Sequence, residues 1–256
     1  MSSRSSSRRL RRALQRLDAG SDRARTLPVI ALAVLAVVVV TAALATQPSA
    51  SSSGPTRAET VASVDAGPLP AAVIGDSISA GTAQGGLGAA NWTKLLGAQR
   101  QWDVVNTSIG GTGYLNPGTA APFQAAQLDK VVTSQPKIVI VEGSPNDITL
   151  PVGQVSAAAD RLYRDLAARL PGVRIIAVGP FWNGTTRDDA MEWVDALADT
   201  AAKAGVTWID PMREGWFTGA YDQGRGLIGP DRVHPTDAGH ALYARRLNAD
   251  LDRLGV

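Results

Sequence analysis

The 256-residue chain contains no cysteine, and this absence excludes several kinds of chemistry at once. Without a thiol there is no disulfide scaffold, thiolate metal site, cysteine nucleophile or lipid attached through cysteine. Histidine is nearly as scarce: the only two, His234 and His240, both lie in DRVHPTDAGH. Their spacing fits neither a helical zinc motif nor a zinc finger, so a metal site would need carboxylate ligands. We therefore predict no metal and no cofactor.

Charged residues are absent between Arg25 and Arg57. This gap contains LPVIALAVLAVVVVTAALAT, residues 27–46, and roughly 20 helical residues at about 1.5 Å each span a bilayer core of about 30 Å. We therefore expect one transmembrane signal-anchor helix at 27–46. The alternative is a cleaved signal peptide, because Ala43-Leu44-Ala45 resembles a cleavage site, although the apolar run exceeds the usual length of about 7 to 15 residues.

Residues 1–26 contain eight arginines, only two acidic residues and many serines. Such a segment is too polar to bury a core, so we expect a disordered arm. A basic flank of a membrane helix stays in the cytoplasm, which predicts a single-pass membrane protein with most of its chain extracytoplasmic. Without this arm, the 25 basic and 23 acidic residues fall to 17 and 21, a net charge of −4. That charge argues against nucleic-acid binding.

Residues 47–69 are rich in serine, alanine, proline and glycine, a composition typical of a flexible linker. A single folded domain is expected at 70–256, where short apolar runs alternate with helical periodicity. This alternation predicts an α/β domain of three α/β/α layers, with a mainly parallel sheet of about five strands. We expect strands at 71–75, 103–108, 137–143, 174–180 and 206–210, and helices at 154–170, 186–205 and 236–254.

Polar groups follow most of the predicted strands. GDS follows the first strand, NTSIGGTG overlaps the end of the second, GSPND follows the third, PFWNG follows the fourth, and DRVHP leads into the last helix. Parallel sheets bind ligands at the carboxyl ends of their strands. We therefore expect the chemistry of this protein at that edge.

Ser77 directly follows a predicted strand, where a strand-to-helix turn can expose its hydroxyl, although Ser77 could instead simply cap the helix. Its surroundings do not match the Gly-x-Ser-x-Gly elbow, because Ser79 occupies the last position, and no phosphate-binding Gly-x-x-x-x-Gly-Lys loop is present. Asp231 lies three residues before His234, close enough to orient the imidazole from one loop. A serine, a histidine base and an acid are the parts of nucleophilic acyl transfer. We assign His240 a packing or capping role.

Four short motifs together resemble a known family. GDS at 75–77, NTSIGG at 106–111, the pair Asn146-Asp147 and DRVHPT at 231–236 occur in the order of the four blocks of the SGNH (GDSL-type) hydrolases. The resemblance covers about residues 70–256. It implies a flavodoxin-like fold and a serine esterase that works through an acyl-serine intermediate.

The resemblance also implies a role for individual residues. Ser77 would be the nucleophile, His234 the general base and then acid, and Asp231 the group that orients His234. The oxyanion donors would be the backbone N–H groups of Ser77 and Gly111 and the side-chain amide of Asn146. Fixed amide donors of this kind stabilise the oxyanion of a tetrahedral intermediate.

The third block departs from the family pattern. That block usually reads Gly-x-Asn-Asp, whereas GSPND has Ser144 at the usual glycine position and Pro145 directly before Asn146. Of the site residues that the resemblance implies, Asn146 is therefore the one whose role as an oxyanion donor this departure bears on.

The sequence leaves three functions open. The first is a membrane-tethered serine esterase acting on a small acyl, carbohydrate or lipid ester, such as acetylated envelope polysaccharide. The second is an O-acyltransferase with the same triad, and the third is a non-catalytic envelope-binding module. Four aromatic residues in predicted loops would either line a sugar or acyl site or simply pack: Trp182, Trp216, Phe217 and Tyr221. The sequence makes no prediction of oligomeric state.

Overall fold

A computed structural model describes residues 67–180, 188–218 and 225–256. The predicted arm at 1–26, the signal-anchor at 27–46 and nearly all of the linker lie outside these ranges, as do Trp182 and Tyr221. Within the described ranges, no helix is long and apolar enough to cross a membrane.

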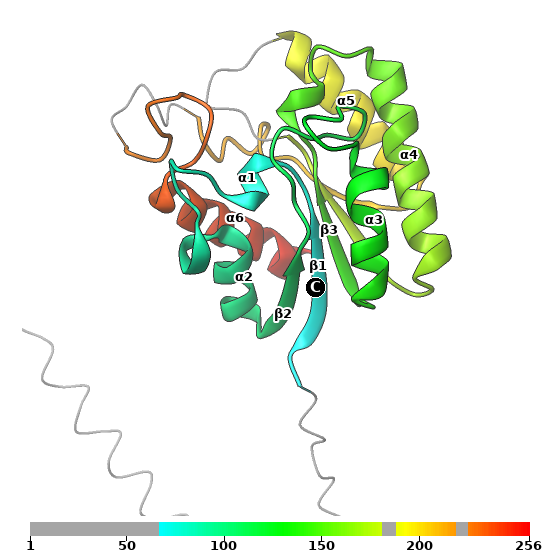
Figure 1. The fold of residues 1–256 in the computed structure, drawn as a ribbon, viewed down its shortest axis with the longest axis horizontal. Coiled ribbons are helices and arrows are strands. Elements are labelled where there is room, and N and C mark those ends of the chain that lie inside the picture. Colours follow the sequence, from blue (N-terminus) through cyan, green and yellow to red (C-terminus); the bar gives the residue numbers. More distant parts are fainter. Residues whose placement is uncertain (1–66, 181–187, 219–224) are drawn as a thin grey trace, which may run out of the picture. The chain divides into compact units, whose positions relative to one another are not determined.

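Five parallel strands form one sheet in the order β2-β1-β3-β4-β5. Figure 1 labels the first three of this order, β2, β1 and β3. Their residues are mostly β-branched or alanine, and the central strands are buried on both faces, as parallel strands usually are. All five predicted strands are confirmed within a few residues. The strands are β1 (Leu69–Ile74), β2 (Trp102–Asn106), β3 (Ile138–Glu142), β4 (Arg174–Val178) and β5 (Thr207–Ile209).

Helices cover both faces of the sheet, which confirms the three-layer α/β/α architecture (Figure 1). One face packs against α2 (Trp92–Arg100) and α6 (Asp237–Arg253). The other face packs against α3 (Phe123–Thr133), α4 (Val152–Arg169) and α5 (Asp188–Lys203). Alternate residues of β1, β3 and β4 enter the two cores, because successive side chains of a strand point to opposite faces.

Helices α2 and α3 were not predicted from the sequence. Helix α2 is only 9 residues long and contains Gly97, a poor helix former. A Cβ atom at Gly97 would lie 3.1 Å from both the Trp102 carbonyl oxygen and Val104 Cγ2. The glycine therefore lets α2 pack closely against β2, and tertiary contacts outweigh the weak local preference.

Trp216 and Phe217 belong to the core and not to a substrate-binding wall. They are only 1% and 2% exposed. Both rings pack against Tyr243 of α6, with centroids 5.2 and 6.5 Å away. Of the two roles open to these aromatic residues, packing is the one they have.

The chain order of the strands creates a switch point between β1 and β3. The chain runs from β1 to β2 on one side of the sheet and then returns to place β3 on the other side. Open parallel sheets bind ligands in the crevice at such a point, beyond the carboxyl ends of the strands. A short helical turn follows each of the two strands at this point: α1 (Ser77–Ala80) follows β1, and η2 (Pro145–Asp147) follows β3.

Candidate active site

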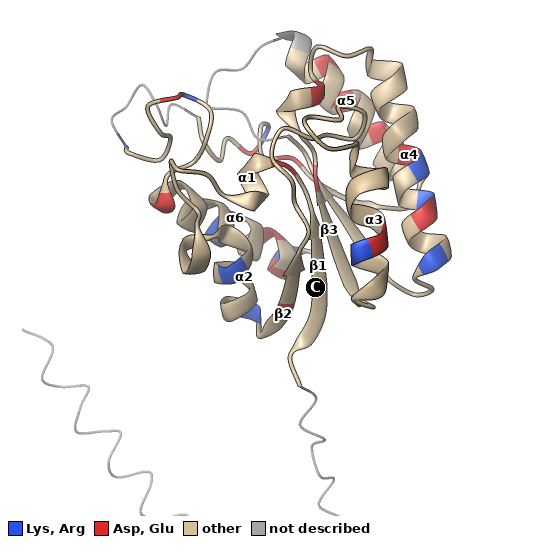
Figure 2. Cartoon of the chain, in the orientation of Figure 1, with Lys and Arg blue, Asp and Glu red and all other residues tan. Residues whose placement is uncertain are grey.

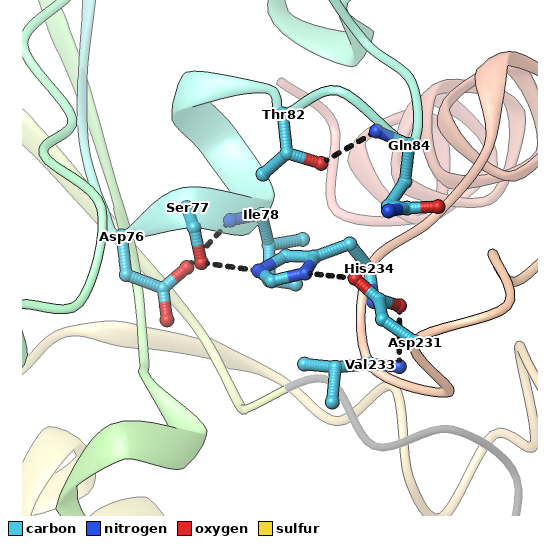
Figure 3. A network of polar contacts seen from close by, with 8 residues as sticks. All are labelled: Asp76, Ser77, Ile78, Thr82, Gln84, Asp231, Val233 and His234. Carbon is cyan, nitrogen blue, oxygen red and sulfur yellow. Dashed lines mark hydrogen bonds and ion pairs between the residues drawn. The ribbon is translucent and has the colours of Figure 1, made fainter.

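Ser77, His234 and Asp231 form one continuous chain of hydrogen bonds (Figure 3). Ser77 is the first residue of α1, and its Oγ lies 2.8 Å from His234 Nε2. On the other side of the imidazole ring, Nδ1 lies 2.7 Å from Asp231 Oδ2. The fold thus brings together two segments 157 residues apart.

The carboxylate of Asp231 is held in place by three hydrogen bonds, one of them from the His234 imidazole. It also accepts hydrogen bonds from the backbone N–H groups of Val233 and His234, at 2.9 and 3.0 Å. Burial alone would raise the pKa of Asp231, but the hydrogen bonds from the His234 backbone and imidazole outweigh it and lower that pKa. An ionised Asp231 accepts a hydrogen bond from Nδ1–H, which leaves the unprotonated Nε2 of a neutral imidazole free to take the Ser77 proton.

The turn that carries Ser77 is held by buried polar side chains. Gln127 of α3 brackets Gly75: its Nε2 donates to the Gly75 carbonyl at 2.9 Å, and its Oε1 accepts from the Gly75 N–H at 3.1 Å. Asp76 caps α1, because its Oδ1 accepts from the backbone N–H of Ile78 at 2.7 Å. Gln127 was not predicted from the sequence, where its one signal is that it is a polar residue among the apolar positions of its segment.

Gly111 lies in the loop beside the nucleophile. Its φ of +78° is in the left-handed region, where glycine carries no steric cost. A Cβ atom on the preceding Gly110 would lie 3.5 Å from Ser77 Cβ, so this backbone runs directly alongside the serine. The location suits an oxyanion donor, and the role of the Gly111 N–H in catalysis remains a prediction.

Asp147, the acid of the third block, holds the loop that follows Gly111. Its carboxylate accepts hydrogen bonds from the backbone N–H groups of Tyr114, Leu115 and Asn116, at 2.7, 3.2 and 2.8 Å. Burial raises the pKa of Asp147, while these three bonds act in the opposite direction. Gly113 is required next to it, because a Cβ atom there would lie 2.4 Å from Asp147 Oδ2. The acid of the third block therefore shapes the loop of the second block.

The side-chain amide of Asn146 contacts Asp76, the residue before the nucleophile, and both of its protons are already engaged. Nδ2 donates to Asp76 Oδ2 and to the carbonyl oxygen of Thr112, both at 3.1 Å. These two bonds use both amide protons. A hydrogen bond from Asn146 to an oxyanion requires one of them to be exchanged, so the oxyanion role remains a prediction.

His240 has the packing role predicted for it. It is 1% exposed, and its Nδ1 accepts a hydrogen bond from the backbone N–H of Trp92 at 3.3 Å. Burial lowers the pKa of His240 to about 4, so the ring is neutral at physiological pH. Gly86 leaves room for this ring, because a Cβ atom there would lie 2.0 Å from His240 Nε2. Across the described ranges, no group of three or more His, Asp or Glu side chains is placed to hold a metal ion.

Acidic residues appear on the outer helices α4 and α5 in Figure 2, whereas Glu142, the last residue of β3, is fully buried. Its Oε2 is hydrogen-bonded to the hydroxyl of Ser79, and its Oε1 is buried with no partner among the described residues. Burial raises the pKa of Glu142 well above its usual range, and the nearby charge of Asp76 adds to this effect. A Cβ atom at Gly75 would lie 2.9 Å from Glu142 Oε2, which explains the glycine of GDS.

Glu142→Gln should make the stability of the protein less dependent on pH. Because the folded-state pKa is raised, the unfolded chain loses this proton first, and stability falls as pH rises from the ordinary glutamate range toward the raised pKa. Each pH unit of that window costs about 1.4 kcal/mol. Glutamine does not titrate, so the melting temperature of E142Q relative to wild type should increase between pH 5 and pH 8.

The control for this prediction is Glu192→Gln, at an exposed position on α5. Its melting temperature should follow that of wild type at every pH. An E142Q-minus-wild-type difference that stays constant with pH would show that Glu142 is not held protonated.

Comparison with known proteins identifies the family of this chain. Residues 73–242 match the model of the GDSL-like lipase/acylhydrolase family. A GDSL lipase of Mycobacterium tuberculosis is 31% identical over 187 residues, which cover 70% of this chain and 79% of that protein. Among solved structures, the esterase EstA from Pseudoalteromonas sp. has a TM-score of 0.56 at 16% identity, covering 72% of this chain and 97% of that one.

Axe2, an acetylxylan esterase from Geobacillus stearothermophilus, has a TM-score of 0.53 at 21% identity, covering 74% of this chain and 96% of that one. At these identities the two structures establish the shared fold. The family match covers more than half of the chain, and the lipase is more than 30% identical. The chain therefore belongs to the GDSL-like lipase/acylhydrolase family, the SGNH hydrolases, and is a serine ester hydrolase.

Proposed function

We propose that this protein is a membrane-tethered esterase that removes acetyl or similarly small acyl groups from envelope carbohydrate outside the cell membrane. The observation that carries the proposal is the hydrogen-bonded chain from Ser77 Oγ through His234 to Asp231. The carbohydrate substrate is supported by the shared fold with an acetylxylan esterase. The location is supported by the uncharged segment at 27–46 and the arginine-rich flank before it.

In the first half-reaction, Ser77 Oγ attacks the ester carbonyl carbon while its proton passes to His234 Nε2. Asp231 stabilises the imidazolium that forms. Fixed N–H donors beside the serine stabilise the oxyanion, a role that we assign to the backbone of Ser77 and Gly111 and the amide of Asn146. The carbon–oxygen bond to the alcohol then breaks, and His234 returns the proton to the leaving oxygen.

In the second half-reaction, water takes the place of the alcohol. His234 Nε2 removes a proton from water as the water oxygen attacks the acyl-serine carbonyl. The tetrahedral intermediate collapses, Ser77 recovers its proton from His234, and a carboxylic acid is released. No external electron or cofactor is needed to balance these steps.

Hydrolysis of a p-nitrophenyl ester series by the full chain, beside acetate release from acetylated polysaccharide, tests the substrate class. We expect kcat/KM to be highest for acetate and to fall with longer acyl chains, with acetate released from the polysaccharide. A preference for long acyl chains would overturn the small-acyl assignment. Product formed only when a sugar acceptor is supplied would identify an acyltransferase.

A C-terminal topology reporter tests the location. We expect a reporter that requires export to be active and the N-terminus of the membrane-bound protein to be intact. A reporter active only in the cytoplasm would overturn the extracytoplasmic location, and a mature N-terminus near residue 46 would overturn the anchor.

A further inference from the structure

Ser144, which stands where the family usually has glycine, makes two hydrogen bonds at the centre of the site. Its side chain is completely buried. The Ser144 hydroxyl donates to Asp76 Oδ2 at 2.5 Å and accepts from the backbone N–H of Asn146 at 3.1 Å. One hydroxyl thus connects the turn after β3 with the residue directly before the nucleophile Ser77.

The carboxylate of Asp76 receives three hydrogen bonds while fully buried. Oδ1 accepts from the Ile78 backbone N–H, and Oδ2 accepts from both the Ser144 hydroxyl and the Asn146 amide. Without Ser144, the Asn146 amide would be the one remaining donor to Oδ2 among these three. A buried carboxylate oxygen that loses its last donor is costly. Ser144 therefore determines how easily the Asn146 amide can leave Asp76.

We propose that Ser144 is a positioning residue: its hydroxyl keeps Asp76 hydrogen-bonded when the Asn146 amide turns from Asp76 to the oxyanion. The inference rests on the proposed function, since it requires an acyl-serine reaction in which Asn146 is an oxyanion donor. Ser144 does not touch the substrate. Both amide protons of Asn146 are engaged in 3.1 Å hydrogen bonds, so the amide must give up one of them to bind the oxyanion. Ser144 lowers the free-energy cost of giving up the bond to Asp76, and that cost arises when the oxyanion forms.

The same hydroxyl favours the ionised form of Asp76. Burial raises the pKa of Asp76 to about 6, while the Ser144 hydrogen bond acts in the opposite direction. Its ionisable neighbours are Glu142 at the end of β3, Asp147 of η2, His234 and Tyr243 of α6. A proton on Oδ2 would point toward the Ser144 and Asn146 donors, so the ionised form is the one that accepts all three bonds.

Removing the hydroxyl should raise the pKa of Asp76 further, so activity should be lost at a higher pH on the acid side. We expect Ser144→Ala in the full chain to lower kcat for p-nitrophenyl acetate about tenfold at pH 8, with KM within about twofold. The acid limb of the kcat profile should move up by about one pH unit.

A double-mutant cycle separates this role from simple bracing. In an Asn146→Ala background the exchange no longer occurs, so adding Ser144→Ala should lower kcat less than about twofold further. The control is Ser156→Ala, on α4, which removes a buried serine hydroxyl that has no hydrogen-bond partner in the described ranges. This variant should keep kcat within about twofold of wild type. Ser144→Gly provides the same comparison if the alanine variant does not fold.

An unchanged kcat and acid limb in Ser144→Ala would overturn the inference, as would an equal fall in kcat in both backgrounds. Neither outcome affects the proposed function. Failure of the proposed function is recognised separately, by esterase activity that survives in Ser77→Ala.

Discussion

Replacing Ser77 by alanine is expected to lower kcat for ester hydrolysis by about 10⁴- to 10⁶-fold without unfolding the protein. The Oγ atom removed is the one that forms the acyl bond, and it lies 2.8 Å from the base that takes its proton. Ser77 is half-buried at the start of α1, and the cap of that helix comes from Asp76, so the helix keeps its N-terminal hydrogen bond. Steady-state kinetics on p-nitrophenyl acetate, with a thermal melt of each variant, measure both quantities.

His234→Ala should be nearly as damaging, and Ser77→Ala/His234→Ala should be no worse than either single variant. This follows because the residues act as one unit, and the remaining activity comes from substrate binding and the oxyanion donors.

Asp231→Asn should also lower kcat strongly, because an amide that donates to Nδ1 holds the imidazole in the wrong tautomer. A fluorophosphonate probe should label wild type and not Ser77→Ala. Near-normal hydrolysis by Ser77→Ala, with activity lost in His240→Ala, would show that the nucleophile and base are assigned wrongly.

Asn146→Ala is expected to lower kcat by about 10²- to 10³-fold with little change in KM. An oxyanion donor acts when the tetrahedral intermediate forms, so its loss appears in kcat and not in substrate binding. In the resting structure the amide donates to Asp76 and Thr112. When it turns from Asp76 to the oxyanion it exchanges one charged acceptor for another, while the Ser144 hydroxyl still donates to Asp76. Kinetics and the free energy of unfolding should be measured on the same purified variant.

A neighbouring asparagine provides the matched control. The Asn116 amide donates to the Asn146 carbonyl oxygen at 2.8 Å and braces the same turn through the backbone alone. Asn116→Ala should therefore destabilise the fold by about 1 to 2 kcal/mol and lower kcat less than about tenfold. If Asn146→Ala behaves in the same way as Asn116→Ala, then Asn146 is a brace and not an oxyanion donor.

Ser144, Asp147 and Glu142 show why the supporting residues of the site were harder to predict than its triad. Asp231 and His234 are three residues apart in one loop, so their pairing is local and visible in the sequence. Asp147 instead binds backbone more than 30 residues away, and Glu142 pairs with Ser79 across 63 residues. Such hydrogen-bond partners depend on which loops meet above the sheet, and the spacing of residues along the chain does not predict which loops meet.

The sequence by itself determined the five strands, the three long helices and the edge at which the chemistry lies. Those features depend on the local periodicity of apolar residues, which each segment carries on its own. The tertiary structure alone decided the strand order, the short helices α2 and α3, and the burial of Trp216 and Phe217. It also decided that the Asn146 amide donates a hydrogen bond to Asp76. The physical reason is that packing and buried hydrogen bonds join segments far apart in the chain, and their geometry exists only after the sheet has assembled.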